Sequence, residues 1–548
     1  MGNRFVHHHS QSHVLSFLGL CFCLVLLASC GGQNGTTPMN GTNTPTNKQT
    51  LVFPNVGIQD LYSLDPTQAS DDNSTMALNM IYSGLVRLDK DLNVIADQAT
   101  WNISTDRKVY TFTLKPDLTF SDGTPITAES YVYSLTRALS PATDSPNAKL
   151  FLGNIAGAAE VNSGKATTLS GVRALNAQTL QITLSNPTEY FLQVLANPLA
   201  FPVNQKLVQQ YGDPTWANHV VNHGAGSGPF MVKSWKHNAK IVLVPNPHYY
   251  GPHIRLKEVD MIFAVDAHDA FQAYQGGQYN FVWRIISSDL TAARGLAGFT
   301  SQSQLETDAL FFDPQKPPFN HLEVRQAFAY ALDKNQLAQS VLANSVVPAS
   351  TIIPPGIPGY QPAITSLPFD KAKAQATLKI AYPDVTQMEP VTFFYPGSLV
   401  SDTLAAWLRQ TWLSVLGVSV KMVPTETNAY NRAIQDHNIS FGFTQWDADF
   451  PDPYDALALN LLPNETGNWG QWQNSQFEQL VQQAEQSSGS GRLDLYAQAE
   501  QLAINDVGWL PISHQSLAAI IPATVHGVSI THMGLYFGDW SGVYLTTR

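Results

Sequence analysis

All three cysteines of this 548-residue chain lie within its first thirty residues, at Cys21, Cys23 and Cys30. The rest of the chain therefore has no thiol that could form a disulfide, bind a metal or act as a covalent nucleophile. Its fold must depend on hydrophobic cores, and a hydrophobic content of 44% over this length is enough to bury large ones. We expect a chain of this size to divide into two or three lobes.

The N-terminal segment has the pattern of a signal peptide. Residues 14–29 form an apolar run that is short for a membrane span, and residues 30–50 are polar and rich in Gly, Asn and Thr. The junction LASC, residues 27–30, resembles a bacterial lipobox, in which the cysteine receives the lipid. We therefore expect residues 1–29 to be removed and Cys30 to anchor the protein at an extracytoplasmic membrane surface, with 30–50 as a flexible tether. The alternative is an apolar anchor that stays in place, with Cys30 unmodified.

The charge of the chain argues against one class of partner. There are 42 acidic and 30 basic residues, which gives a formal net charge of −12, and no basic block or stripe is present. Proteins that bind nucleic acid normally present such a stripe to the phosphates. We therefore expect no nucleic-acid partner.

The body of the chain mixes strand and helix patterns. Apolar residues alternate in the segments 109–114 and 180–184, which predicts two strands that each bury one face. Thr127 is a candidate helix N-cap, and an apolar stripe at helical spacing follows it to Leu139. A second stripe spans 324–332, and Asp333 with Gln336 makes a capping-box pattern at the start of another helix. The mixture predicts helices that pack on sheets.

Two features concern the organisation of the body. No internal repeat of fixed period is evident. The Pro- and Gly-rich segment 346–362 is predicted to be a long irregular loop within a lobe, because periodic segments continue in the same style on both sides of it.

Six segments together resemble the family 5 extracellular solute-binding proteins, which include the oligopeptide-, dipeptide- and nickel-binding components of bacterial ABC importers. Each segment alone is a weak signal, but all six occur in the order of the family. They are LYSLDPTQASDDNSTMALNMIYSGLVRLDKD (61–91), FSDGTPITAESYVYSLTRAL (120–139), GSGPF (226–230), NPHYYG (246–251), VRQAFAYALD (324–333) and WDADFPDPYDAL (446–457).

The resemblance implies an α/β fold: a two-lobed, hinged clamp of the periplasmic-binding-protein type II kind, with mixed sheets and an extra small α+β domain. Lobe one would comprise residues 51–82, 206–305 and 513–548. The small domain would comprise 83–205, and lobe two 306–512. The implied protein is a monomer without a cofactor that captures peptides between its lobes and delivers them to the permease subunits of an ABC importer.

The resemblance also implies ligand-binding residues. Asp449 falls where peptide-binding members place the carboxylate that pairs with the α-ammonium of the ligand, and Trp446 matches a position that shapes the same pocket. Ser70, Asp71 and Asp72 match the edge of lobe one that pairs with the extended ligand backbone. Without a ligand role, Asp449 would belong to a solvated acidic loop, Trp446 to a core, and Asp71 and Asp72 to a helix start.

One departure from the family leaves recognition of the peptide C-terminus open. Oligopeptide-binding members can use arginines just before the WDAD segment to bind the peptide carboxylate. Residues 433–448 of this chain contain no Lys or Arg. The preferred peptide length is therefore not predicted.

Other functions have weaker support in the sequence. It has no G-x-S-x-G, HExxH or P-loop motif, so we expect a binding protein and not an enzyme. His219 with His223, and His248 with His253, could suggest a metal, but no acid or thiol is placed to complete a ligand set, and we predict none. A binder of oligosaccharide, nickel chelate or haem on the same fold stays an alternative, and the eleven tryptophans would suit sugar stacking.

Overall fold

The computed structural model describes residues 49–213, 215–221, 223–364, 366–535 and 539–547. The predicted signal peptide and Cys30 lie outside the described residues, as does the predicted tether up to residue 48. Within the described part of the chain, no helix has both the length and the apolar character needed to cross a membrane.

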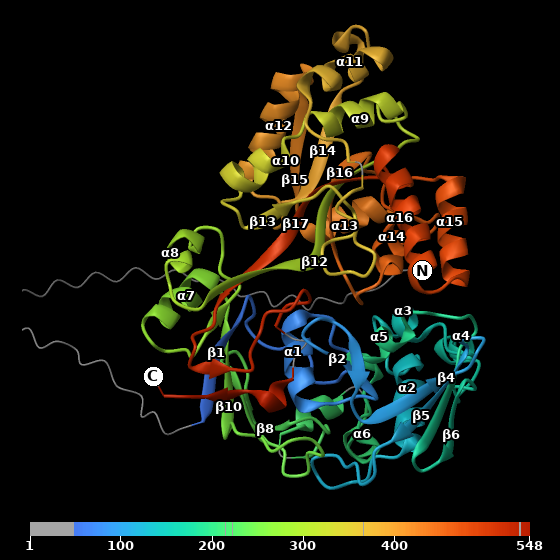
Figure 1. The fold of residues 1–548 in the computed structure, drawn as a ribbon, viewed down its shortest axis with the longest axis vertical. Helices are drawn as coiled ribbons and strands as arrows, with labels where there is room; N and C mark the ends of the chain where they lie inside the picture. The colour runs from blue at the N-terminus through green and yellow to red at the C-terminus, as the bar shows by residue number, and fades with distance from the viewer. Residues whose placement is uncertain (1–48, 214, 222, 365, 536–538, 548) are drawn as a thin grey trace, which may run out of the picture. The chain divides into compact units, whose positions relative to one another are not determined.

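The first sheet has four strands in the order β1-β10-β9-β8 (Figure 1). Strand β1 is parallel to β10, and the other pairs are antiparallel. Leu51 and Phe53 alternate along β1 and are fully buried in one core, which also receives Met76 and Ile81 of helix α1. The elements are β1 (Thr50–Val56), α1 (Asp72–Ile81), β8 (Phe230–Lys236), β9 (Lys240–Pro245), β10 (Glu258–Ala264), α7 (Ala267–Gln275) and α8 (Leu290–Arg294).

A second, antiparallel sheet has the order β4-β5-β7-β6. The predicted strands at 109–114 and 180–184 are confirmed as β5 and β7, which pair with Phe112 opposite Leu180. The predicted helix after Thr127 is α2, where Thr127 and Ser130 form a capping box. The elements are β2 (Val86–Leu88), β3 (Val94–Ala96), β4 (Ala99–Ile103), β5 (Val109–Leu114), α2 (Ala128–Leu139), α3 (Ala148–Leu152), α4 (Ala158–Asn162), β6 (Val172–Asn176), β7 (Thr179–Thr183), α5 (Phe191–Leu195) and α6 (Gln205–Tyr211).

The third sheet has seven strands, in the order β11-β17-β12-β16-β14-β15, with β13 paired to β17. Its strands are β11 (Val282–Trp283), β12 (Phe299–Phe312), β13 (Val346–Pro348), β14 (Val391–Pro396), β15 (Val420–Thr425), β16 (Phe441–Asp447) and β17 (Trp509–Ile520). Its helices are α9 (Leu322–Tyr330), α10 (Lys334–Gln336), α11 (Lys371–Ala381), α12 (Asp402–Leu416), α13 (Thr427–Gln435), α14 (Pro453–Leu461), α15 (Ser475–Gln486) and α16 (Gly489–Asn505). A last pair, β18 (Val525–His526) and β19 (Tyr544–Leu545), ends the chain.

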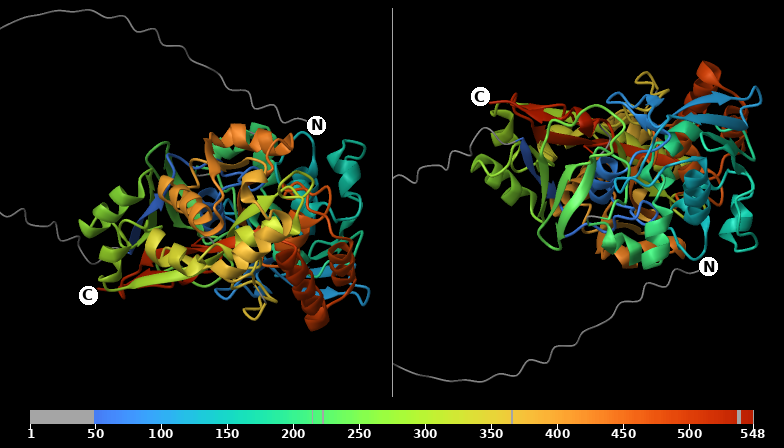
Figure 2. Two further views of the ribbon diagram at one scale, coloured as in Figure 1. Left: turned by 90° about the horizontal axis from the view of Figure 1, so that it is seen from above. Right: turned by 90° about the horizontal axis from the view of Figure 1, so that it is seen from below.

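Helices cover both faces of the seven-stranded sheet. Leu310 and Phe312 of β12 join a core with α9, α11 and α12. Ala309 and Phe311 point the opposite way, into a core with α14, α15 and α16, because successive side chains of a strand alternate between faces. Figure 2 shows these helices from two further directions.

The apolar stripe predicted at 324–332 starts on helix α9, and the capping-box pattern at Asp333 begins helix α10. Helix α9 ends at Tyr330, and Asp333 caps α10 by accepting a hydrogen bond from the Gln336 amide at 3.0 Å. Helix α10 is followed by a single turn of π-helix at Leu337–Val341. The segment 346–362 begins with the three-residue strand β13 and is otherwise irregular.

The long strands β12 and β17 connect the third sheet with the part of the chain that holds β1 and β10 (Figure 1). The predicted lobe boundaries at residues 305 and 512 fall within these two strands, which continue through them. The pairing of β12 with β17 is irregular between Ser303 and Thr307. The division into lobes stays a prediction, and this irregularity is the natural place for a hinge between them.

Candidate functional site

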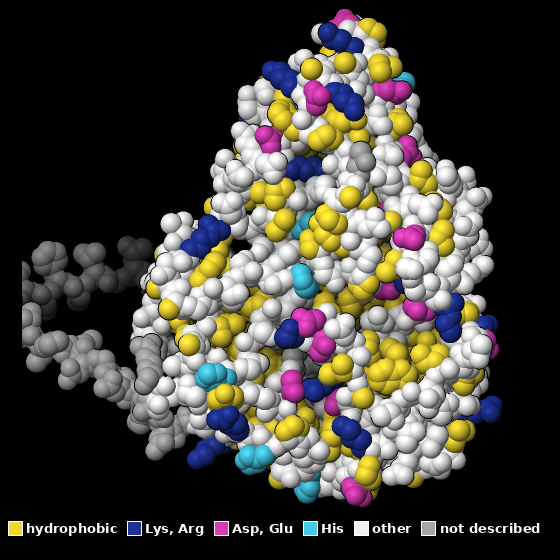
Figure 3. Space-filling view, viewed as in Figure 1, with side chains coloured by type: hydrophobic (Ala, Val, Ile, Leu, Met, Phe, Trp, Pro, Cys, Tyr) yellow, Lys and Arg dark blue, Asp and Glu magenta, His cyan; other side chains and the backbone are white. Residues whose placement is uncertain are grey.

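A cavity of about 420 Å³ lies between the start of α1 and the third sheet. It is lined from the start of α1, the end of β11, the middle of β12, the end of β16 and the loop at 532–534. A second cavity of about 90 Å³ adjoins it, because Ser70, Asp72, Ala448, Asp449 and Met533 line both. Acidic and basic side chains gather over α1 near the centre of the face in Figure 3.

The structure brings together four of the five residues predicted to bind ligand. Asp449, Ser70 and Asp72 line both cavities, and Asp71 lines the smaller one. Trp446 lines neither; it is 7% exposed and belongs to the core beneath β16. Trp446 could therefore affect the cavity only indirectly, through the backbone that it shares with Asp447.

Asp449 follows the end of β16 and is half-buried. Its backbone amide donates to Oδ2 of Asp455 at 2.6 Å, which fixes the direction of the chain at this point. Burial raises the pKa of the Asp449 carboxyl from 3.8 to about 6. Among the described residues, no Lys or Arg forms an ion pair with it. The carboxylate is therefore positioned to accept a cation from a ligand.

The rest of the acidic run after Asp449 is buried. Asp455 is 1% exposed, and Asp452 caps α14 by accepting a hydrogen bond from the Tyr454 amide at 2.9 Å. Arg492 of α16 donates to both carboxylate oxygens of Asp452, at 2.8 and 2.7 Å. Because Asp452 is ion-paired and Asp455 accepts hydrogen bonds from the Asp449 and Phe450 amides, the segment is not a solvated loop, and it holds Asp449 in a defined place.

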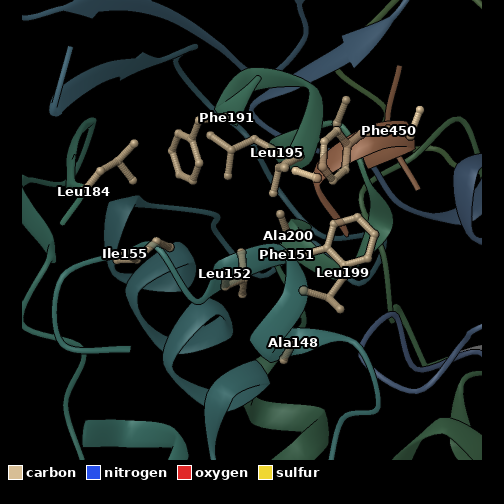
Figure 4. Close-up of a cluster of buried hydrophobic side chains, with 14 of the residues drawn as sticks. Ala148, Phe151, Leu152, Ile155, Leu184, Phe191, Leu195, Leu199, Ala200 and Phe450 are labelled. Atoms are coloured by element: carbon tan, nitrogen blue, oxygen red, sulfur yellow. The ribbon is translucent and has the colours of Figure 1, made fainter. Parts of the chain in front are cut away.

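Phe450 attaches the same segment to residues 148–200. Its ring stacks on Tyr190, with centroids 4.6 Å apart, and meets the edge of Phe151 at 6.3 Å. Figure 4 shows Phe450 beside Phe151, Leu195 and Leu199 in a cluster of buried side chains. The residue next to Asp449 is thus anchored in a hydrophobic core.

The start of α1 forms the opposite side of the cavities. Asp71 is the N-cap, and its Oδ1 accepts a hydrogen bond from the Ser74 amide at 2.9 Å. Its Oδ2 is buried and has no hydrogen-bond partner among the described residues. Asp72 forms an ion pair with Arg284 at 2.8 Å. Asp71 and Asp72 therefore both begin helix α1 and line one or both of the cavities.

Glu306 and Arg284 line the larger cavity and were not identified from the sequence. Glu306 on β12 lies directly opposite Asp447 on β16. Glu306 is half-buried and Asp447 is exposed to the open cavity. Desolvation by the surrounding protein, and then the charge of Asp447, raises the pKa of Glu306 well above its usual value, while desolvation and the charge of Asp72 raise the pKa of Asp447 to about 6. The sequence places Glu306 and Asp308 just before the apolar residues ALFF, but it gives no sign that Glu306 meets Asp447 or that Arg284 lies nearby.

The histidines considered as metal ligands are placed differently. His219 stacks on Tyr211 with centroids 4.0 Å apart, and His223 lies 3.3 Å from the hydroxyl of the same tyrosine. Within the described ranges, no group of three His, Cys, Asp or Glu side chains has the arrangement to hold a metal ion.

Comparison with known proteins identifies the family. Residues 95–468 match the model of the bacterial extracellular solute-binding proteins, family 5. The chain is 31% identical to the probable deoxycholate-binding periplasmic protein YgiS of Escherichia coli, over 88% of this chain and 92% of that protein. It is 26% identical to the oligopeptide-binding protein OppA of Bacillus subtilis, over 95% and 97%.

The fold agrees with this relationship. The unliganded open form of the murein tripeptide-binding protein MppA superposes with a TM-score of 0.79 at 26% identity, over 92% of this chain and 98% of that one. The α/β clamp expected from the sequence motifs is thereby confirmed. The chain belongs to family 5 of the bacterial extracellular solute-binding proteins.

Proposed function

We propose that this protein captures peptides in the cavity beside Asp449 and delivers them to the permease of an ABC importer, without catalysing a reaction. The observation that carries the proposal is the half-buried Asp449 carboxylate, which lines a cavity of about 420 Å³ at the position where the family resemblance puts the partner of a peptide ammonium. An ammonium group enclosed by protein needs such a partner, because an unpaired buried charge is costly. The oligopeptide-binding protein among the relatives supports the same ligand class.

A bile acid is the second candidate, because one relative is named as probably deoxycholate-binding. Deoxycholate carries a carboxylate, and an anion is repelled by a cavity lined with acids. The described lining contains four acidic residues: Asp72, Glu306, Asp447 and Asp449. It contains one arginine, Arg284, which forms an ion pair with Asp72. The charge of the lining therefore favours an ammonium ligand over a carboxylate ligand.

An oligosaccharide has less support from the lining. Sugar-binding sites usually offer exposed aromatic faces for stacking. Trp283 is the tryptophan that lines the larger cavity, and it is only 1% exposed.

Mass spectrometry of ligand retained by the purified 31–548 protein tests all three ligand classes. Retained peptides would support the proposal, and a retained bile acid or sugar would overturn it.

We also propose that Cys30 carries a lipid anchor at an extracytoplasmic membrane surface, on the basis of the LASC junction. Cys30→Ala is expected to release the protein from membranes or to stall its processing, because the acceptor of the lipid is removed. Fractionation and the apparent mass of the protein measure this. A mutant that stays in the membrane fraction at the mature size would contradict the anchor.

Ligand is expected to close two lobes across the cavity. The long strands β12 and β17 cross between the predicted lobes, and the irregular pairing between Ser303 and Thr307 allows bending there. Small-angle scattering should therefore give a smaller radius of gyration when a peptide is added. An unchanged radius under conditions of demonstrated binding would contradict the clamp motion.

A further inference from the structure

Two acidic residues on neighbouring strands line the larger cavity as a directly opposed pair. Glu306 of β12 is the register partner of Asp447 of β16, and both line the cavity. Like charges placed directly opposite on neighbouring strands destabilise a sheet. Asp308, two residues after Glu306, is satisfied by hydrogen bonds from Ser513, Gln445 and Gln515. The Glu306–Asp447 pair has no comparable set of donors among the described residues, so a cation is the partner that would relieve it.

The surroundings of the pair reinforce its negative charge. Among the described residues that line the cavity, Arg284 is the one Lys or Arg. It forms an ion pair with Asp72, and its charge also acts to lower the pKa of Asp447. The smaller cavity adds the Oδ2 atom of Asp71, which is buried without a hydrogen-bond partner in the described structure. Both cavities thus present acceptors without donors from the described residues, and Asp449 lines both cavities.

Asp449 and the carboxyl pair are presented to the same cavity. Asp447 is the last residue of β16, and Asp449 lies two residues further on, in the bend that follows the strand. In an extended lysine, the α-nitrogen and the side-chain nitrogen are separated by roughly 7 Å, from standard bond lengths. An N-terminal lysine thus carries two separated cations, and the cavity presents Asp449 and the Glu306–Asp447 pair as separate acceptors.

We propose that the cavity selects peptides whose first residue has a basic side chain, with Asp449 binding the α-ammonium group and the Glu306–Asp447 pair binding the side-chain cation. This inference rests on the proposed peptide-binding function and specifies its substrate class. Neutral first residues would leave the carboxyl pair without a partner. Their peptides would bind through Asp449 and backbone contacts alone.

The ionisation of the pair is consistent with this role. The pKa values of both carboxyls are raised, and each lies within hydrogen-bond reach of the other, so one proton can be shared between them in the empty cavity. Other charged or titratable groups around them are Asp72, Arg284, Asp308, Asp449 and His532, and His514 lies against the backbone of Glu306. An arriving cation favours the ionised pair, and the proton is then released. Preference for a basic first residue should therefore increase as the pH rises through about 6.

Calorimetry with two tripeptides tests the proposal. Lys-Ala-Ala and norleucyl-Ala-Ala differ in the side-chain ammonium of the first residue and are otherwise close in shape. Wild-type protein is expected to bind the lysine peptide about 10- to 100-fold more tightly, as for a hydrogen bond to a charged group. In the Glu306→Gln, Asp447→Asn double variant this ratio should fall to about twofold or less. Asp494→Asn, which removes an exposed acid of α16 that lines neither cavity, should keep the wild-type ratio.

Proton release gives a readout that a purely structural role would not change. Enthalpies at pH 6 in two buffers of different ionisation heat should reveal protons released by the lysine peptide and not by the norleucine peptide, and the double variant should lose this difference. Failure of both peptides to bind would overturn the proposed function itself. Binding of both with equal affinity to wild type, or an unchanged ratio in the double variant, would overturn only the selection of a basic first residue.

Discussion

Asp449→Asn is expected to weaken the binding of trialanine by about 30- to 1000-fold, or about 2 to 4 kcal/mol, which is the range for truncating one partner of a buried charge pair. The change keeps the size of the side chain but removes the charge that the peptide ammonium would meet. The Asp449 backbone amide would still donate to Asp455, so the local chain should keep its course. Isothermal titration calorimetry measures the loss.

Acetylation of the peptide amino group provides the complementary change. It removes the same interaction from the ligand side, so acetylated trialanine should bind wild type about as weakly as free trialanine binds Asp449→Asn. Because both changes remove one contact, the double-mutant cycle should be clearly non-additive. If free and acetylated peptides bind wild type equally well, or if the two losses simply add, Asp449 is not the ammonium partner.

The pH dependence checks the same assignment. Burial raises the pKa of the Asp449 carboxyl to about 6, and only the ionised form attracts an ammonium. Affinity for trialanine should therefore be fully present well above pH 6 and should decrease as the pH falls through 6. Asp449→Asn should remove this part of the pH dependence, since the amide does not titrate in this range.

The second large effect is expected on stability, from Arg492→Met. Arg492 and Asp452 are 3% and 5% exposed, and the variant would leave the Asp452 carboxylate enclosed without its cation. Loss of one partner of a buried pair costs about 3 to 5 kcal/mol. Hydrogen exchange at amides of α14 and α16 should show this reduction in the free energy of local or global unfolding.

Two further variants make this test specific. Arg432→Met removes an exposed arginine on α13 and should cost less than about 1 kcal/mol. Arg492→Met combined with Asp452→Asn should recover much of the loss, because Asn carries no charge and is still a good N-cap for α14. If the single Arg492→Met variant is as stable as Arg432→Met, the pair does not hold the segment after Asp449.

The local elements of this protein were predictable because their signals are short-range. Alternation in 109–114 and 180–184 identified β5 and β7, and Thr127 followed by an apolar stripe identified α2. These patterns depend on the period of a strand or helix, which neighbouring residues set by themselves. The motif order identified the family, and through it Asp449 as a residue beside the cavity.

The carboxyl pair could not be predicted in this way. Glu306 and Asp447 are far apart in the chain and meet only because β12 and β16 pair in one particular register. A shift by one residue would exchange the faces of all side chains on a strand, and the packing of whole lobes determines which register forms.

Sequence by itself thus determined the family, the strands and helices with clear periodicity, and the acid expected to meet the peptide ammonium. Tertiary structure alone decided which distant groups became partners. It placed Trp446 in the core, paired Arg492 with Asp452 and left Oδ2 of Asp71 without a donor among the residues that the structure describes. The physical reason is that periodicity is set by neighbours along the chain, whereas contacts between distant side chains depend on strand register and on how helices pack over the sheet.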